Sequence, residues 1–175
     1  MTAYPHNVNV SGKSPWPWAT RKVRIEGDMY LTIARPIGLH WHRRVAKSLS
    51  GQVIFSLRKK APLSPDYLLK ETDRPTVAIR PIQMGHWLCK SATDALEVYH
   101  LGGSKSIISQ NGCQIAIMSI QPGFSLLNDH QVHLRVNKEE YLNLSIAMAL
   151  LLDDYQLHLS GNIFPQTKVS TLQTG

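Results

Sequence analysis

The sequence predicts a mainly β protein, a closed antiparallel β-barrel of about twelve strands around a hydrophobic C-terminal helix. From residue 22 onward, short segments rich in β-branched and aromatic residues alternate with Gly, Pro, Asn or Asp, which is typical of many short strands. A run of residues that is apolar on every side follows the last of these segments. A barrel of this many strands is too wide for its own side chains to fill, so the helix is expected to fill it.

The chain has 175 residues, the size of one domain with a single core. Because 43% of the residues are hydrophobic and only 18% are charged, the composition excludes a disordered, collagenous or coiled-coil chain. We predict an irregular N-terminal arm over residues 1–20 and a barrel over residues 21–160, with its central helix near 138–153. A tail over residues 161–175 is expected to follow.

The arm contains Pro15-Trp16-Pro17-Trp18 and shows no hydrophobic period. The candidate strands after it are Lys22–Glu26, Met29–Arg35, His40–Ala46, Gln52–Lys59, Tyr67–Glu71, Thr76–Pro81, His86–Lys90, Ala95–Leu101, Lys105–Ser109, Cys113–Ile120 and His130–Val136.

The strongest local prediction is a hairpin at Asn111-Gly112, because these residues tolerate the positive φ angles of a tight turn. In the last candidate strand, Val132, Leu134 and Val136 alternate with polar residues, as in a barrel wall with one buried face.

The period changes at Asn137, which can cap a helix, while Glu140 three positions on can complete a capping box. The apolar run Tyr141–Leu152 then predicts a helix of roughly 18 Å, too short for a hydrocarbon layer of ~30 Å. We expect protein to enclose it and to bury its side chains, including Ala147, Met148, Leu150 and Leu151. The acidic pair Asp153-Asp154 opposes the helix dipole at this end, and nothing in the sequence explains it.

The order of features from Leu101 to Asp154 resembles the tubby C-terminal-like superfamily, particularly its small bacterial and LURP-one-related members, which are related to phospholipid scramblases. The matching features are the Asn111-Gly112 turn, Gln114–Ile120, Phe124, the strand Gln131–Val136, Glu139-Glu140 and the apolar segment Leu144–Asp154. The resemblance implies a barrel around a hydrophobic C-terminal helix.

Within that superfamily, tubby proteins bind phosphoinositides through basic side chains on the barrel surface, and scramblase-type members act at membranes. This chain departs from both groups. It lacks the tubby C-terminal signature, and it has neither a membrane-spanning tail nor a cysteine-rich palmitoylation segment. No lipid-binding residue is therefore carried over from the family.

The charge distribution points to an anionic partner. Up to Lys90 the chain has 15 basic and 5 acidic residues, and after it 4 and 7, so the first part carries +10 and the second −3. The predicted ligand-binding residues are those of three basic clusters: Arg58 with Lys60, Arg43 with Arg44, and Arg21 and Lys22 with Arg24. Adjacent strand residues face opposite sides, so Arg58 and Lys60 share a face and Lys59 points away from it. A solvated strand end is the alternative reading.

Catalytic and metal-binding patterns are missing from the sequence. It contains neither a Gly-x-Ser-x-Gly nor a Gly-x-x-x-x-Gly-Lys motif, so we expect no enzymatic activity and no cofactor. His40 with His42, and His130 with His133, lack the further ligands that a metal site needs. Cys89 and Cys113 are widely spaced and are expected to be reduced, buried thiols.

The N-terminal residues Met1–Ser14 do not resemble a secretory signal, and no segment is long and apolar enough to span a membrane. We therefore expect a cytoplasmic protein that binds an anionic lipid head group, such as a phosphoinositide, at the inner face of a membrane. The alternative is an assembly or scaffold subunit whose basic face docks a protein or nucleic acid. The arrangement of charge distinguishes the two: a compact pocket favours lipid, and a long stripe favours nucleic acid.

Overall fold

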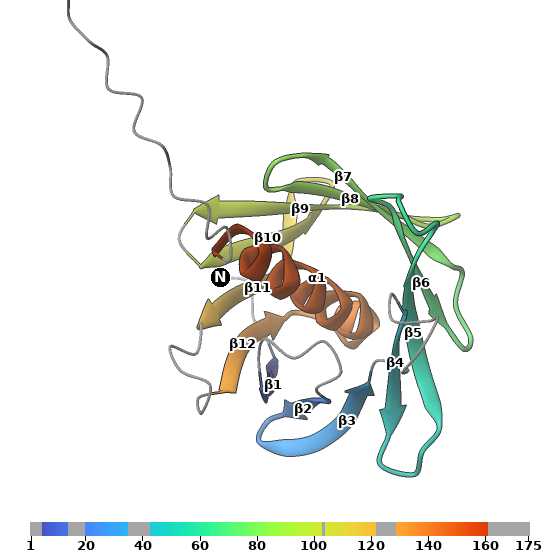
Figure 1. Ribbon diagram of the computed structural model, residues 1–175, viewed down its shortest axis with the longest axis vertical. Helices are drawn as coiled ribbons and strands as arrows, with labels where there is room; N and C mark the ends of the chain where they lie inside the picture. The colour runs from blue at the N-terminus through green and yellow to red at the C-terminus, as the bar shows by residue number, and fades with distance from the viewer. Residues whose placement is uncertain (1–4, 14–19, 35–42, 103, 122–128, 161–175) are drawn as a thin grey trace, which may run out of the picture.

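The computed structural model describes residues 5–13, 20–34, 43–102, 104–121 and 129–160. Within these residues, twelve antiparallel strands form one closed barrel, and helix α1 runs through its middle (Figure 1). Each strand pairs with its sequence neighbours, and β1 closes the ring by pairing with β12. The predicted fold class, a closed antiparallel barrel with one C-terminal helix, is confirmed.

The strands are β1 His6–Lys13, β2 Arg21–Ile25, β3 Asp28–Ala34, β4 Arg43–Ser48, β5 Val53–Lys59, β6 Tyr67–Glu71, β7 Val77–Gln83, β8 His86–Lys90, β9 Ala95–Gly102, β10 Lys105–Gln110, β11 Cys113–Gln121 and β12 Asp129–Val136. All of the strands predicted from residue 22 onward form, with small shifts at their ends. The predicted beginning of β4 at His40–His42, the Pro15–Trp18 segment and the tail 161–175 lie outside the described residues.

Strand β1 corrects the prediction of an irregular arm over residues 1–20. It pairs with β12 from His6↔Val136 to Lys13↔Asp129 and with β2 over part of its length. Val8 and Val10 face the core, each 2% exposed, while Asn7 and Asn9 alternate with them and are more exposed. Asn disfavours strands, so the pairing with β12 and β2 outweighs local propensity here.

The predicted hairpin at Asn111-Gly112 joins β10 and β11, with Gln110 paired to Cys113. The φ angles of Asn111 and Gly112 are 50° and 78°, in the region that a tight two-residue hairpin turn requires.

The helix begins differently from the prediction. A 3-10 turn over Glu139–Tyr141 precedes α1, Leu142–Ser160, and the N-cap residue is Lys138, which makes no side-chain capping bond. Asn137 does not cap the helix, because its side-chain oxygen Oδ1 has no hydrogen-bond partner among the described residues. Its amide nitrogen donates to the Gln114 backbone carbonyl at 3.4 Å, and its backbone N–H donates to the Ile115 carbonyl at 3.0 Å. The predicted capping box is therefore wrong: Asn137 fastens the end of β12 to β11.

The helix is enclosed as predicted. Every residue from Leu144 to Asp153 is buried, and the four side chains singled out from the sequence are between 0% and 4% exposed: Ala147, Met148, Leu150 and Leu151. The helix continues past the predicted end to Ser160, so its 19 residues are about 28 Å long. The inward residues of the strands surround it, with Phe55, Leu69, Ile79 and Met118 among the fully buried ones.

Candidate functional site

The barrel has two ends with different connections, because consecutive antiparallel strands turn at alternate ends. The helix-N end, where α1 begins, carries the turns 26–27, 49–52, 72–76, 91–94 and 111–112. The helix-C end is the end toward which the C-terminus of α1 points. Among the described residues it carries the connections 60–66 and 84–85. Most of the candidate site residues lie toward this second end, whereas Arg24 lies two residues from the turn 26–27 at the helix-N end.

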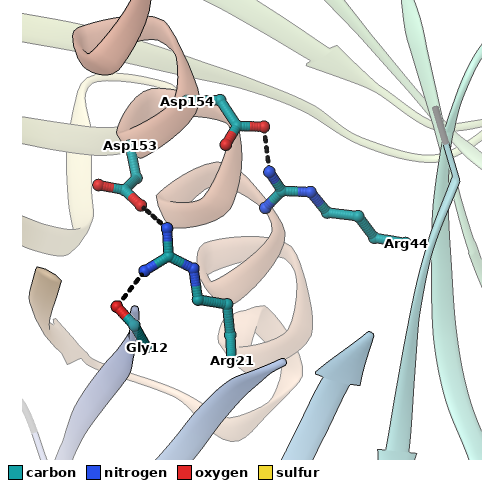
Figure 2. A network of polar contacts seen from close by, with 5 residues as sticks. All are labelled: Gly12, Arg21, Arg44, Asp153 and Asp154. Atoms are coloured by element: carbon teal, nitrogen blue, oxygen red, sulfur yellow. Dashed lines mark hydrogen bonds and ion pairs between the residues drawn. The ribbon is translucent and has the colours of Figure 1, made fainter. Parts of the chain in front are cut away.

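Two of the predicted ligand-binding residues, Arg21 and Arg44, point into the barrel toward the end of the helix (Figure 2). Arg21 donates to Asp153 at 2.7 Å and to the Gly12 carbonyl at 2.9 Å. Arg44 forms an ion pair with Asp154. The side chains of Arg21 and Asp153 are only 11% and 3% exposed, so water screens their pairing weakly.

These ion pairs explain the acidic pair that the sequence left without a role. A buried carboxylate needs a charged and hydrogen-bonded partner, and each aspartate has an arginine from the wall. Arg21 and Arg44 therefore neutralise the two aspartate charges of the helix inside the barrel, and these ion pairs occupy their guanidinium groups. The local clusters Arg21-Lys22 and Arg43-Arg44 are split by strand alternation between the inside and the outside.

The outward members of the other clusters form a basic patch. Arg43 on β4 lies directly opposite Arg58 on β5, and both are exposed. Lys60 is exposed just beyond β5, and its backbone N–H donates to the backbone carbonyl of Asp66 at 2.8 Å. Lys59 is half-buried and lies over the Tyr67 ring, with its Nζ 6.0 Å from the ring centroid. The opposite facing of Arg58 and Lys59 agrees with the strand alternation. We call Arg43, Arg58 and Lys60 the basic patch.

Sequence reasoning missed further outward cations on the same wall. They are single residues in separate strands and so form no visible cluster in the sequence, but alternation within each strand places them outside: Lys47, Lys70, Arg80 and Lys90. Of these, Arg80 forms an ion pair with Asp66 at 3.3 Å. Together they extend positive charge from β4 to β8.

Exposed apolar side chains gather at the helix-C end. Leu63 in the connection 60–66 is 98% exposed, Met84 in the β7–β8 turn is 77% exposed, and Leu101 at the end of β9 is 62% exposed. Ile82 in β7, beside Met84, is 51% exposed. Large apolar side chains so fully in water, close to a basic patch, are features of interaction surfaces.

Lys22 and Arg24, the remaining predicted residues, are exposed on the outer face of β2. They lie on a different wall from the basic patch, and Arg24 lines a groove that crosses β1, β12 and β11. The seven predicted residues therefore occupy three places: the interior, the β4–β5 wall and the β2 wall.

The cysteines and histidines show no catalytic arrangement among the described residues. Cys89 is buried beside the Met148 sulfur at 3.6 Å, and burial raises the pKa of its thiol to about 12, so it stays protonated. Cys113 is exposed, which corrects the prediction that both thiols are buried. No group of three or more His, Cys, Asp or Glu residues in the described part of the chain is placed to hold a metal ion. His40 and His42 lie outside the described residues.

No helix in the part of the chain that the structure describes combines the length and apolar character needed to cross a membrane.

Comparisons with known proteins show a shared fold and no family. No protein-family model matches the chain, and a search of curated proteins found no match. Among solved structures, the chain is similar to an X-ray structure of a protein from Arabidopsis thaliana, with a TM-score of 0.59 and 13% identity. The alignment covers 89% of this chain and 94% of the plant protein. The two chains therefore share a fold, and the closed twelve-stranded barrel described here fits a tubby-like barrel fold.

Proposed function

We propose that this chain is a non-enzymatic, tubby-like domain that docks peripherally on an anionic membrane surface, with its helix-C end and basic patch toward the lipid. The observation that carries the proposal is the coincidence of exposed apolar side chains and outward cations at one end of the barrel. Each kind of residue alone is common on protein surfaces, but together they match the two components of an anionic bilayer.

The apolar component is the set of exposed loop side chains. The Leu63 side chain is 98% exposed, so it contributes no hydrophobic burial to the fold. Its transfer to the boundary between head groups and acyl chains removes its apolar surface from water, which is favourable. Met84 and Leu101 project from neighbouring turns at the same end. Shallow insertion of these three side chains anchors the domain without any membrane-spanning segment.

The charged component is the basic patch. Like charges directly opposite each other on paired strands repel, and Arg43 and Arg58 occupy such a pair. A phosphate group between them relieves the repulsion and accepts paired hydrogen bonds from a guanidinium. We therefore assign head-group contact to Arg43, Arg58 and Lys60, and propose a phosphoinositide or another anionic phospholipid as the ligand. The inner leaflet, which is anionic, is the surface proposed.

The charge test compares three reversals that change the net charge equally. We expect Arg58→Glu and Lys60→Glu to lower pelleting with phosphatidylserine-containing vesicles at least fivefold, since each surface cation contributes about 1 kcal/mol. Lys59→Glu should have a smaller effect, because Lys59 faces away from the patch. The salt is held at about 0.15 M, where the screening length is ~8 Å. Equal losses in all three variants would reduce the proposal to diffuse attraction.

The apolar test uses a matched pair of leucines from the two ends. Leu63→Ser at the helix-C end should weaken vesicle binding, whereas Leu49→Ser should not, although Leu49 is 68% exposed at the helix-N end. Loss of binding in both variants, or in neither, would contradict the proposed orientation.

A gel-shift experiment with single-stranded and duplex nucleic acid at two salt concentrations examines the alternative partner. If Arg58→Glu abolishes a nucleic-acid shift while the wild-type protein ignores vesicles, the chain is an assembly or scaffold subunit and the membrane proposal is wrong.

A further inference from the structure

A polar groove of about 930 Å³ lies on the outer face of the five strands β2, β1, β12, β11 and β10. This wall is on the other side of the barrel from β5 to β7, so the groove is separate from the basic patch. Its volume is within the range of small-molecule sites in proteins.

The groove is hollow because of the side chains along one row of the sheet. Cross-strand pairing aligns five outward positions, one from each strand in turn: Arg24, Asn9, His133, Ser119 and Lys105. The middle three are shorter and half-buried, while the cations at the two ends are long and exposed. Since neighbouring strands are ~4.8 Å apart, the backbones at these two positions are at most about 19 Å apart across the sheet.

The floor of the groove is a hydrogen-bonded network of amides around His133. The Asn9 amide lies 3.3 Å from His133 Nδ1 and 3.4 Å from the Gln131 carbonyl oxygen, and His133 Nε2 lies 3.4 Å from the Gln121 carbonyl oxygen. If Asn9 donates to Nδ1, then Nε2 carries the proton and donates to Gln121. The Asn9 carbonyl oxygen and the amide groups of Gln121 and Gln131 then retain hydrogen-bonding capacity toward the groove.

The charge of the groove is positive and unbalanced. Arg24, Lys105 and Arg135 line it, and none of them forms an ion pair with a residue that the structure describes. The acidic group in the lining, Glu26, accepts hydrogen bonds from the Asn7 backbone N–H at 2.7 Å and from the Asn7 amide at 3.4 Å. These bonds lower the pKa of Glu26 and commit its carboxylate to β1. Glu26 offsets one of the three positive charges, so the lining keeps a net charge of +2 that an anion of the ligand can neutralise.

We propose that this groove binds a hydroxylated small molecule that carries phosphate or sulfate groups, such as a sugar bisphosphate. The amides and hydroxyls of the floor suit sugar hydroxyls, and the separated cations suit anionic groups at opposite ends of the ligand. The lining contains no Phe, Tyr or Trp side chain, and the ring nitrogens of its one imidazole, His133, lie against Asn9 and Gln121, which disfavours stacked nucleotide bases. Its polar floor likewise disfavours an apolar ligand.

The test follows the side-chain amide signals of Asn9, Gln121 and Gln131 by NMR in the isotope-labelled full chain. Fructose bisphosphate should shift these signals saturably, inorganic phosphate should shift them at higher concentration, and fructose alone should leave them in place. Lys105→Gln should weaken binding of the bisphosphate about tenfold, as expected for a lost charge-assisted contact. The matched variant Lys138→Gln, at the helix-N end, should not weaken it.

Unmoved amide signals at millimolar bisphosphate and phosphate would overturn the proposal, as would equal weakening by Lys105→Gln and Lys138→Gln. A phosphorylated lipid head group is a second source of the same chemistry. Binding of the free bisphosphate in the absence of vesicles distinguishes the groove from the basic patch, whose variants are scored on vesicles.

Discussion

The two ends of the barrel close around the same helix with different chemistry. At the helix-N end, the contacts around the first turn of the helix are mainly hydrogen bonds: Asn143 donates to Glu71 at 2.7 Å, and Tyr141 donates to Gln110 at 2.7 Å. At the helix-C end, two arginines of the wall hold two aspartates of the helix as ion pairs (Figure 2).

The surface charge of the two ends also differs. Acidic residues outnumber the cations Arg74, Lys90 and Lys138 around the start of the helix: Glu26, Asp28, Glu71, Asp73, Asp94, Glu139 and Glu140. The helix-C end has the basic patch and the exposed Leu63 and Met84. The first end is closed by short turns and is rich in acidic residues, while the second carries the basic patch and four of the six exposed large apolar side chains in the described residues. This contrast is the reason for assigning partner contact to the helix-C end.

The largest expected effect comes from a charge placed midway between the ends. Leu150 is 1% exposed inside the barrel, and Leu150→Asp leaves a carboxylate there without a partner. We expect a loss of at least about 5 kcal/mol, comparable to the whole stability of a domain. Circular dichroism and urea unfolding measure it, and a soluble variant with a normal melting transition would disprove the central helix.

The next prediction compares the polar contacts that hold the helix at the two ends of the barrel. Asp153→Asn leaves the Arg21 guanidinium without its counter-charge in a weakly hydrated place, and we expect a loss of about 3 kcal/mol in the free energy of unfolding. Asn143→Ala at the other end should lose about 1.5 kcal/mol. The double variant Arg21→Met with Asp153→Leu should recover most of the loss, since it removes both charges. Equal losses in the free energy of unfolding for Asp153→Asn and Asn143→Ala would show that the two ends hold the helix equally strongly, contrary to this comparison.

A smaller effect distinguishes two glycines. A Cβ at Gly12 would lie 2.6 Å from the Cδ of Arg21, so Gly12→Ala displaces the side chain that pairs with Asp153. At Gly112 there is open space, but φ is 78°, so Gly112→Ala costs about 1–2 kcal/mol through backbone strain.

Double-mutant unfolding experiments separate these mechanisms. Gly12→Ala should be non-additive with Asp153→Asn, whereas Gly112→Ala should be additive with it. Additivity in both pairs would show that Gly12 is independent of the ion pair.

The smallest effect is a pH dependence at the helix-N end. The Asn7 hydrogen bonds lower the pKa of Glu26 below its ordinary value of 4.5, so its contribution to stability is present above that pH. It is lost as the pH falls through the lowered pKa. The Glu26→Gln variant should therefore melt below the wild-type protein above pH 4.5, and the difference between their melting temperatures should shrink as the pH falls below 4.5. A difference that stays constant across the acidic range would contradict this reasoning.

Much of the fold was predictable because alternation of apolar and polar residues is a local signal. The turn chemistry of Asn111-Gly112 identified the hairpin, whereas alternation identified the strands from residue 22 onward and the opposite facing of Arg58 and Lys59. Alternation failed at β1, where Val8 and Val10 carried a weak form of the signal. The capping pattern at Asn137 failed as well, because its side-chain oxygen caps no backbone N–H and its amide nitrogen donates to the carbonyl of Gln114.

The candidate site was less predictable because its partners are distant in the chain. Arg21 and Asp153 are 132 residues apart, and Arg44 and Asp154 are 110 apart, so no local pattern links them. Alternation indicates which of two neighbouring arginines points inward, but it cannot name the group that an inward side chain meets. The groove likewise arises from five strands whose residues become neighbours only through pairing.

The pairing of β1 with β12 also determines when the protein can fold. Asn9 and Gln131, which meet across this seam, are 122 residues apart, so the first strand emerges from the ribosome long before its partner. Until β12 has been synthesised, the edge of β1 that pairs with it stays unpaired, as does the edge of the last strand made so far. The helix α1, which fills the core, is also absent until then. Contacts of such sequence separation slow folding and prolong exposure to aggregation. This architecture therefore implies that the closed barrel forms only after the last strand and α1 have been synthesised.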